Sequence, residues 1–92
     1  MSISEVRAHI DQVDEQIVTL LATRQKLVRE AARYKADQQA VRAPDRRAAM
    51  MIRLQELATR YGVSPEVVHR TYTAMIDAFI DLELQEHALI DE

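Results

Sequence analysis

A stripe of apolar residues runs through the first third of the chain at the spacing of an α-helix. Its members recur mostly at intervals of three and four and are Ile3, Val6, Ile10, Val13, Ile17, Leu20, Leu27, Ala31 and Tyr34. No proline or glycine interrupts residues 4–36. The segment therefore favours one long amphipathic helix from about Ser4 to Ala36, and such a helix must bury its apolar face against another element.

Arg24 stands in this stripe where an apolar residue would complete the rhythm between Leu20 and Leu27. A guanidinium group cannot lose its charge, and burying it without a partner is strongly unfavourable. An anionic group should therefore meet Arg24, and that group is either a carboxylate of the protein or a ligand. Taken alone, Arg24 could also extend its head group to the surface.

The composition favours one domain, residues 1–92, and excludes several kinds of protein. There is no cysteine, which excludes disulfides and thiolate metal sites, and the three histidines lack metal-ligand spacing, so we expect no metal or cofactor. No apolar run approaches the ~18 residues of a membrane span and no signal peptide is apparent, so we expect a cytoplasmic protein without membrane contact. The net charge of −3 argues against nucleic-acid binding, although a local cluster of cations could bind a small anion.

Prolines and the single glycine divide the rest of the chain. The segment Asp37–Ala43 loses the stripe and is expected to be a loop, and Pro44 suits the first turn of a second helix that Gly62 ends. A third helix should begin at Ser64-Pro65-Glu66 and end near Ala88. The residues expected to face inward are Met51, Leu54, Leu57 and Ala58 in the second helix and Val68, Tyr72, Met75, Ile76, Phe79 and Ile80 in the third. The sequence thus predicts an all-α protein of three helices with a long first helix.

The length of the first helix predicts a second copy of the chain. A helix over residues 4–36 would be about 50 Å long, whereas a compact globule of this size is about 30 Å across. The helix must overhang its own domain, yet its apolar stripe continues along its whole length. A homodimer in which the first helix pairs antiparallel with its copy is the simplest way to cover the overhang.

Three cationic residues of the first helix can act together in such a dimer. Lys35 follows Arg24 by 11 residues, close to three full turns, so both side chains project from nearly the same face and could bracket a small molecule. Arg7 lies about 25 Å from Arg24 along the helix axis and cannot share that molecule within one chain. In an antiparallel dimer, Arg7 of the partner subunit could lie beside Arg24 of the first subunit.

Two further places carry charge on the inward side. Arg46 and Arg47 open the second helix, whose N-terminus already favours anions. Glu83 follows Phe79 by four residues, which places it on the apolar face of the third helix. Each of these residues alone would pass for an ordinary surface or edge position, but one anion-binding pocket accounts for all of them.

The pattern resembles the all-helical chorismate mutases, including the similar isochorismate-pyruvate lyases. The residues that carry the resemblance are Arg7-x-x-Ile10-Asp11-x-x-Asp14, Leu20-Leu21-x-x-Arg24, Tyr34-Lys35 and Pro44-x-Arg46. The resemblance covers the chain from Arg7 to about Glu83. It implies an intertwined homodimer of three-helix chains, with a site in each half built from both subunits.

The resemblance also implies a role for each charged position. Arg24 and the partner's Arg7 would hold the two carboxylates of chorismate, and Arg46 would be a further arginine of the pocket. Lys35 would reach a carboxylate and the ether oxygen of the breaking bond, and Glu83 would meet the same oxygen. The implied catalytic residues are therefore Lys35, Glu83 and Arg24, and the implied activity is the rearrangement of chorismate to prephenate in aromatic amino-acid biosynthesis, without a cofactor.

Two alternatives stand beside the mutase. The run Ala43-Pro44-Asp45-Arg46 looks more like the loop of the pyruvate lyases, which form salicylate from isochorismate, whereas Glu83 occupies a position where the lyase pattern has glutamine. The second alternative is a non-catalytic helical dimerisation module in which Arg24 and Glu83 merely pair. The residues favour the mutase.

Overall fold

The chain is all-α throughout the part that the structure describes, which confirms the predicted fold class. This computed structural model describes residues 1–91, except for the side chains of Gln38 and of residues 87–91. Its elements are α1 (Ile3–Ala32), α2 (Gln38–Arg42), α3 (Pro44–Tyr61) and α4 (Pro65–Asp91). Three of these are long helices, as expected, and the short α2 is additional. None of the described helices is long and apolar enough to cross a membrane.

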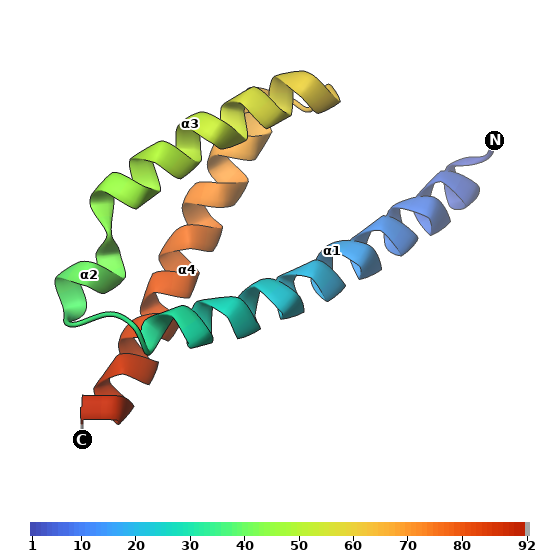
Figure 1. The fold of residues 1–92 in the computed structure, drawn as a ribbon. Coiled ribbons are helices and arrows are strands. Elements are labelled where there is room, and N and C mark those ends of the chain that lie inside the picture. The colour runs from blue at the N-terminus through green and yellow to red at the C-terminus, as the bar shows by residue number, and fades with distance from the viewer. Residues whose placement is uncertain (92) are drawn as a thin grey trace.

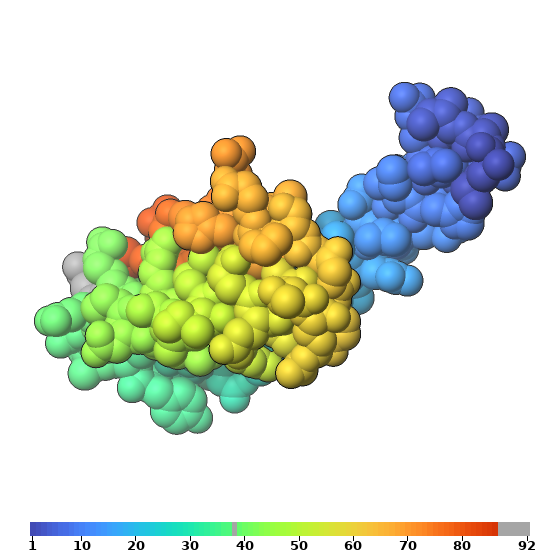
Figure 2. Space-filling model, turned by 90° about the horizontal axis from the view of Figure 1, so that it is seen from above, coloured from blue at the N-terminus to red at the C-terminus, as the bar shows by residue number. Residues whose placement is uncertain are grey.

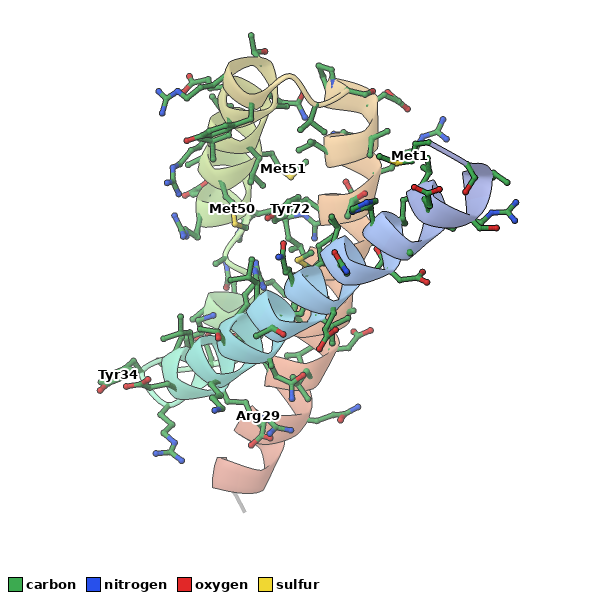
Figure 3. The ribbon with its side chains drawn as sticks, turned by 90° about the vertical axis from the view of Figure 1, so that its right-hand side faces the viewer. Met1, Arg29, Tyr34, Met50, Met51 and Tyr72 are labelled. Atoms are coloured by element: carbon green, nitrogen blue, oxygen red, sulfur yellow. The ribbon has the colours of Figure 1, made fainter. Side chains whose placement is uncertain are left out.

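Helix α4 is the element against which the other three helices pack. Figure 1 shows α3 returning alongside α4, while α1 crosses α4 nearer its C-terminal end and α2 joins the two regions. Among the described side chains, each helix contributes one buried apolar residue, and these are Ala32, Val41, Ala58 and Ile76. Met51, predicted to face inward, points between α3 and α4 (Figure 3). The core of one chain is therefore small.

The N-terminal half of α1 extends away from the rest of the chain, as its length predicted. The helix has 30 residues, about 45 Å, and Figure 2 shows its first turns projecting beyond the body of the molecule. Its apolar stripe is uncovered there, with Ile10 52% exposed, Ile17 47% and Leu20 69%. The predicted overhang is thus confirmed within one chain, and the described residues leave its apolar face largely exposed.

Helix α1 ends at Ala32, four residues before the predicted end. The chain continues in tighter turns, in which the backbone N–H groups of Tyr34 and Lys35 donate to the carbonyl groups three residues before them, over 3.0 and 3.3 Å. This tightening rotates the side chains away from the register of the stripe. Tyr34, expected inward, is 84% exposed and points away from the body of the chain (Figure 3).

The segment expected as a loop contains the short helix α2. The side chain of Asp37 caps it, because Oδ1 accepts a hydrogen bond of 2.8 Å from the backbone N–H of Ala40. Val41 is buried against the other helices and anchors this turn. Ala43 then adopts a left-handed conformation, with φ of 38°, which costs about 1–2 kcal/mol for a non-glycine residue and turns the chain into α3.

The predicted helix boundaries at Pro44 and Gly62 are confirmed. Gly62 has φ of 70° and ends α3, and the N–H of the next residue, Val63, donates to the carbonyl of Ala58 over 2.9 Å. The hydroxyl of Ser64 then accepts from the N–H of Val67 over 3.3 Å and caps the start of α4. Helix α4 runs to Asp91, three residues past the expected end.

We expect Gly62→Ala to lower the free energy of unfolding by about 1 kcal/mol. A Cβ atom at this position would meet nothing within 4 Å, so the loss comes from the left-handed backbone rather than from a clash. Gly62→Asn should lose less, because asparagine tolerates this conformation. Urea unfolding at one protein concentration measures both, and equal losses in the two variants would contradict the conformational explanation.

Candidate active site

A cavity of about 190 Å³ lies where the C-terminal end of α1, the short α2, the start of α3 and the middle of α4 meet. Its described lining combines apolar walls with charged side chains. The charged members are Arg24, Lys35, Arg42, Arg46, Arg47 and Glu83. Four of the five predicted site residues, all except Arg7, are thus brought together around one cavity.

Arg24 enters this cavity from the middle of α1 without a carboxylate partner among the described side chains. Its Nη2 atom lies 4.0 Å from the sulfur of Met50, and its Cζ atom lies 4.8 Å from the centre of the Phe79 ring. Its Nη1 atom is buried and has no hydrogen-bond partner. A buried donor without a partner is unfavourable by about 1–3 kcal/mol, so the site is arranged to receive an acceptor.

Lys35 and Glu83 meet across the cavity. The Nζ atom of Lys35 donates to Oε2 of Glu83 over 2.5 Å, and the Glu83 side chain is only 9% exposed. The tight turns after α1 place the lysine, and the apolar face of α4 places the glutamate. Two residues predicted to reach one ligand atom therefore lie within hydrogen-bond distance of each other, although 48 residues separate them in the sequence.

Arg46 and Arg47 both line the cavity, and they differ in their partners. Nη1 of Arg47 lies 2.7 Å from Oδ1 of Asp77 on α4, so this guanidinium is tied to the wall. Arg46 is exposed at the rim and makes no hydrogen bond or ion pair with the described side chains. Of the two, Arg46 is the one whose charge is not offset by any carboxylate among the described side chains.

Arg7 does not line the cavity of its own chain. It lies on the projecting half of α1, 17 residues before Arg24, which corresponds to about 25 Å along the helix. Arg7 therefore lies outside the cavity of its own chain, as the sequence predicted.

The cavity concentrates positive charge in an acidic protein. Its described lining holds five of the 12 basic side chains and one of the 15 acidic ones. The formal charge of the lining is therefore +4, whereas the net charge of the protein is −3. A cleft lined by one sign of charge raises the local concentration of ligands of the opposite sign, so this cavity favours an anion.

Three residues of the site were not assigned to it from the sequence. Phe79 was expected to face inward as a packing residue, Met50 was given no role in a site, and Arg42 lay in the expected loop. Helical spacing carried the signal for two of them: Phe79 precedes Glu83 by four residues, and Met50 follows Arg46 by four. The position of Arg42 depends on α2, which sequence periodicity did not reveal.

The arrangement can bind and orient a small polyanion and stabilise negative charge that develops near Lys35. Arginine side chains match carboxylate groups geometrically, and a lysine ammonium group acts as a compact positive charge. The described residues include no group of three or more His, Cys, Asp or Glu side chains that could hold a metal ion. The fold and the cavity thus define a small helical protein with a cavity whose charge suits an anion.

Comparison with known proteins agrees with this description. Residues 6–84 match the family described as chorismate mutase type II. An isochorismate pyruvate lyase from Pseudomonas aeruginosa is 32% identical over 78 residues, which cover 85% of this chain and 77% of that protein. The protein therefore belongs to the chorismate mutase type II family, and the predicted family resemblance is confirmed.

We expect Arg24→Met to raise the free energy of unfolding by about 1 kcal/mol. The change removes a buried donor without a partner, a gain of about 1–3 kcal/mol, and loses a cation–π contact of about 0.5–2 kcal/mol. Arg60→Met, at an exposed position of α3, is the matched control and should change stability by less than about 0.5 kcal/mol. Urea unfolding at equal protein concentration measures both, and a loss of stability in Arg24→Met would make Arg24 a structural residue.

Proposed function

We propose that the protein is a chorismate mutase, which rearranges chorismate to prephenate. The observation that carries the proposal is the buried, unpartnered Nη1 atom of Arg24 in the same cavity as the ammonium group of Lys35. A dianion with two carboxylates and an ether oxygen suits this pair of cations. The reaction is a pericyclic rearrangement within one molecule, so it requires groups that position and polarise the substrate rather than a nucleophile.

Positioning supplies the larger share of the acceleration in this proposal. Holding reacting atoms in the productive geometry can remove up to about 7–11 kcal/mol of a barrier, whereas one donor at a developing oxyanion contributes about 3–4 kcal/mol. Arg24 and Arg46 bind carboxylates and fold the flexible substrate into its compact reactive shape. Lys35 donates to the ether oxygen as the carbon–oxygen bond breaks.

Glu83 acts at the same oxygen as Lys35. Its contact of 2.5 Å with Lys35 holds the ammonium group beside the apolar wall of α4. In the proposal, Glu83 therefore acts at the ether oxygen by orienting Lys35 toward it.

The first test offers chorismate and isochorismate separately to the purified protein and quantifies prephenate, salicylate and pyruvate. We expect efficient formation of prephenate from chorismate, and we expect Lys35→Ala to lower kcat by about 10²–10³ because the donor at the oxyanion is lost. Lys26→Ala is the matched control, since Lys26 is exposed on α1 and does not line the cavity. A folded protein that turns over neither substrate would contradict the proposal and favour a non-catalytic dimerisation module.

Isochorismate pyruvate lyase activity is the second candidate function. The specific observation in its favour is the similarity to the lyase from Pseudomonas aeruginosa, at 32% identity. A lyase would use the same cations with a different pose of the substrate. Salicylate and pyruvate formed from isochorismate, at a higher kcat/KM than that of prephenate formation from chorismate, would establish this activity instead.

The proposed working form is an intertwined homodimer. The apolar residues on the projecting half of α1 are exposed in a single chain, and a second copy of the same helix has the complementary length and pattern. Arg7 of the partner subunit would then supply the second carboxylate-binding arginine. In this arrangement, a complete site forms only when two chains form the dimer.

Mixing two inactive variants tests this dependence. In a dimer of Arg7→Ala with Arg24→Met, one site lacks both arginines and the other retains both. We expect each variant alone to be nearly inactive, and an equal mixture refolded together to recover about one quarter of wild-type turnover, because half of the dimers are mixed and each has one intact site. Each variant refolded with itself is the control. No recovery in the mixture would contradict a site shared between two subunits, and an active Arg7→Ala variant would remove Arg7 from the site.

A further inference from the structure

Two described contacts hold the guanidinium group of Arg24, and neither of them comes from an acid. The centre of the Phe79 ring lies 4.8 Å from Cζ, the sulfur of Met50 lies 4.0 Å from Nη2, and Nη1 is buried without a hydrogen-bond partner. Met50 comes from α3 and Phe79 from α4. The charged group is therefore fixed between two helices by neutral side chains.

Two other cations that line the cavity are held by carboxylates instead. Lys35 pairs with Glu83 and Arg47 pairs with Asp77, both on α4. A carboxylate beside a cation offsets its charge and competes with an incoming anion for its N–H groups. An aromatic ring carries no net charge and attracts a cation through the negative face of its π-system. The ring of Phe79 can thus hold Arg24 in place and leave its positive charge available.

We propose that Phe79 is a positioning residue for the substrate carboxylate: it orients Arg24 over its ring without neutralising it. The proposal rests on the proposed function, because it takes the ligand of Arg24 to be a carboxylate of a chorismate-type dianion. Phe79 and Glu83 lie one turn apart on α4. This one helix therefore holds both Arg24, which comes from α1, and Lys35, which comes from the turn after α1. The ring places Arg24, and the carboxylate of Glu83 places Lys35.

This role predicts an effect on KM rather than on kcat. Phe79→Leu keeps Arg24 but lowers the fraction of the protein that holds it in the binding orientation. A smaller binding-competent fraction raises KM without changing the complex once it has formed. We expect Phe79→Leu to raise KM about tenfold, in keeping with a desolvated cation–π contact, and to change kcat less than twofold. A merely structural role would instead reduce the amount of folded enzyme, which lowers apparent kcat at unchanged KM.

The experiment measures kcat and KM for the substrate that the wild-type protein turns over, chorismate or isochorismate. Phe79→Tyr keeps the aromatic ring and should restore KM to within about threefold of wild type, because the cation–π contact remains. Phe79→Met fills similar space without the ring and should behave like Phe79→Leu, which also covers the case of a poorly folded Phe79→Leu. Val68→Ala is the matched control: it removes half-buried packing from α4 away from the cavity and should leave KM unchanged.

Each outcome either supports or overturns the role proposed for Phe79. A raised KM in the leucine and methionine variants, with recovery in the tyrosine variant, supports the proposal. Equal KM values for wild type and Phe79→Leu, or an equally raised KM in Phe79→Tyr, would overturn it while leaving the proposed function intact. If the wild-type protein turns over neither substrate, the proposed function fails, and the role of Phe79 in binding fails with it.

Discussion

The uncompensated charge of Arg24 is the constraint on which the rest of the site depends. A guanidinium group enclosed by apolar side chains is stable only because favourable packing elsewhere exceeds the penalty of its unpartnered donor. Phe79 and Met50 reduce that penalty without removing the charge. The free protein is therefore less stable than it would be with this donor paired, and an anion bound in the cavity would remove that penalty. Binding energy of this kind is available to fold a flexible substrate into a reactive shape.

The length of α1 connects this site to the assembly of the protein. One helix carries Arg24 at the cavity and an exposed apolar stripe on its projecting half. The described core of one chain is small, with Ala32, Val41, Ala58 and Ile76 buried, and much of the apolar surface of α1 is exposed. Covering that surface with a second α1 would at the same time bring a second arginine toward the cavity. Stability and function would then favour the same dimer.

Sequence periodicity and local signals were sufficient for the long helices, because the relevant physics is local. Pro44 and Gly62 act through their own backbone preferences, and both boundaries lie where they were predicted. Helix α2 was missed because five residues are too few to show a period, and its signal was the capping side chain of Asp37. The different environments of Arg46 and Arg47 could not be predicted for another reason: they depend on Asp77, thirty residues away in the chain. Only the packing of α3 on α4 brings that carboxylate to one arginine and not to its neighbour.

The same cavity chemistry suits both candidate reactions, and the reason lies in the bond that breaks. Rearrangement of chorismate and elimination of pyruvate from isochorismate both cleave the ether carbon–oxygen bond, so both develop negative charge on that oxygen. Lys35, held by Glu83, would meet this shared requirement in either case. What separates the reactions is the conformation in which the enol-pyruvyl group is held over the ring, and this depends on where its carboxylate is anchored. In the proposed function Arg24 is the anchor for one carboxylate, and Phe79 and Met50 are the described side chains that hold it in place.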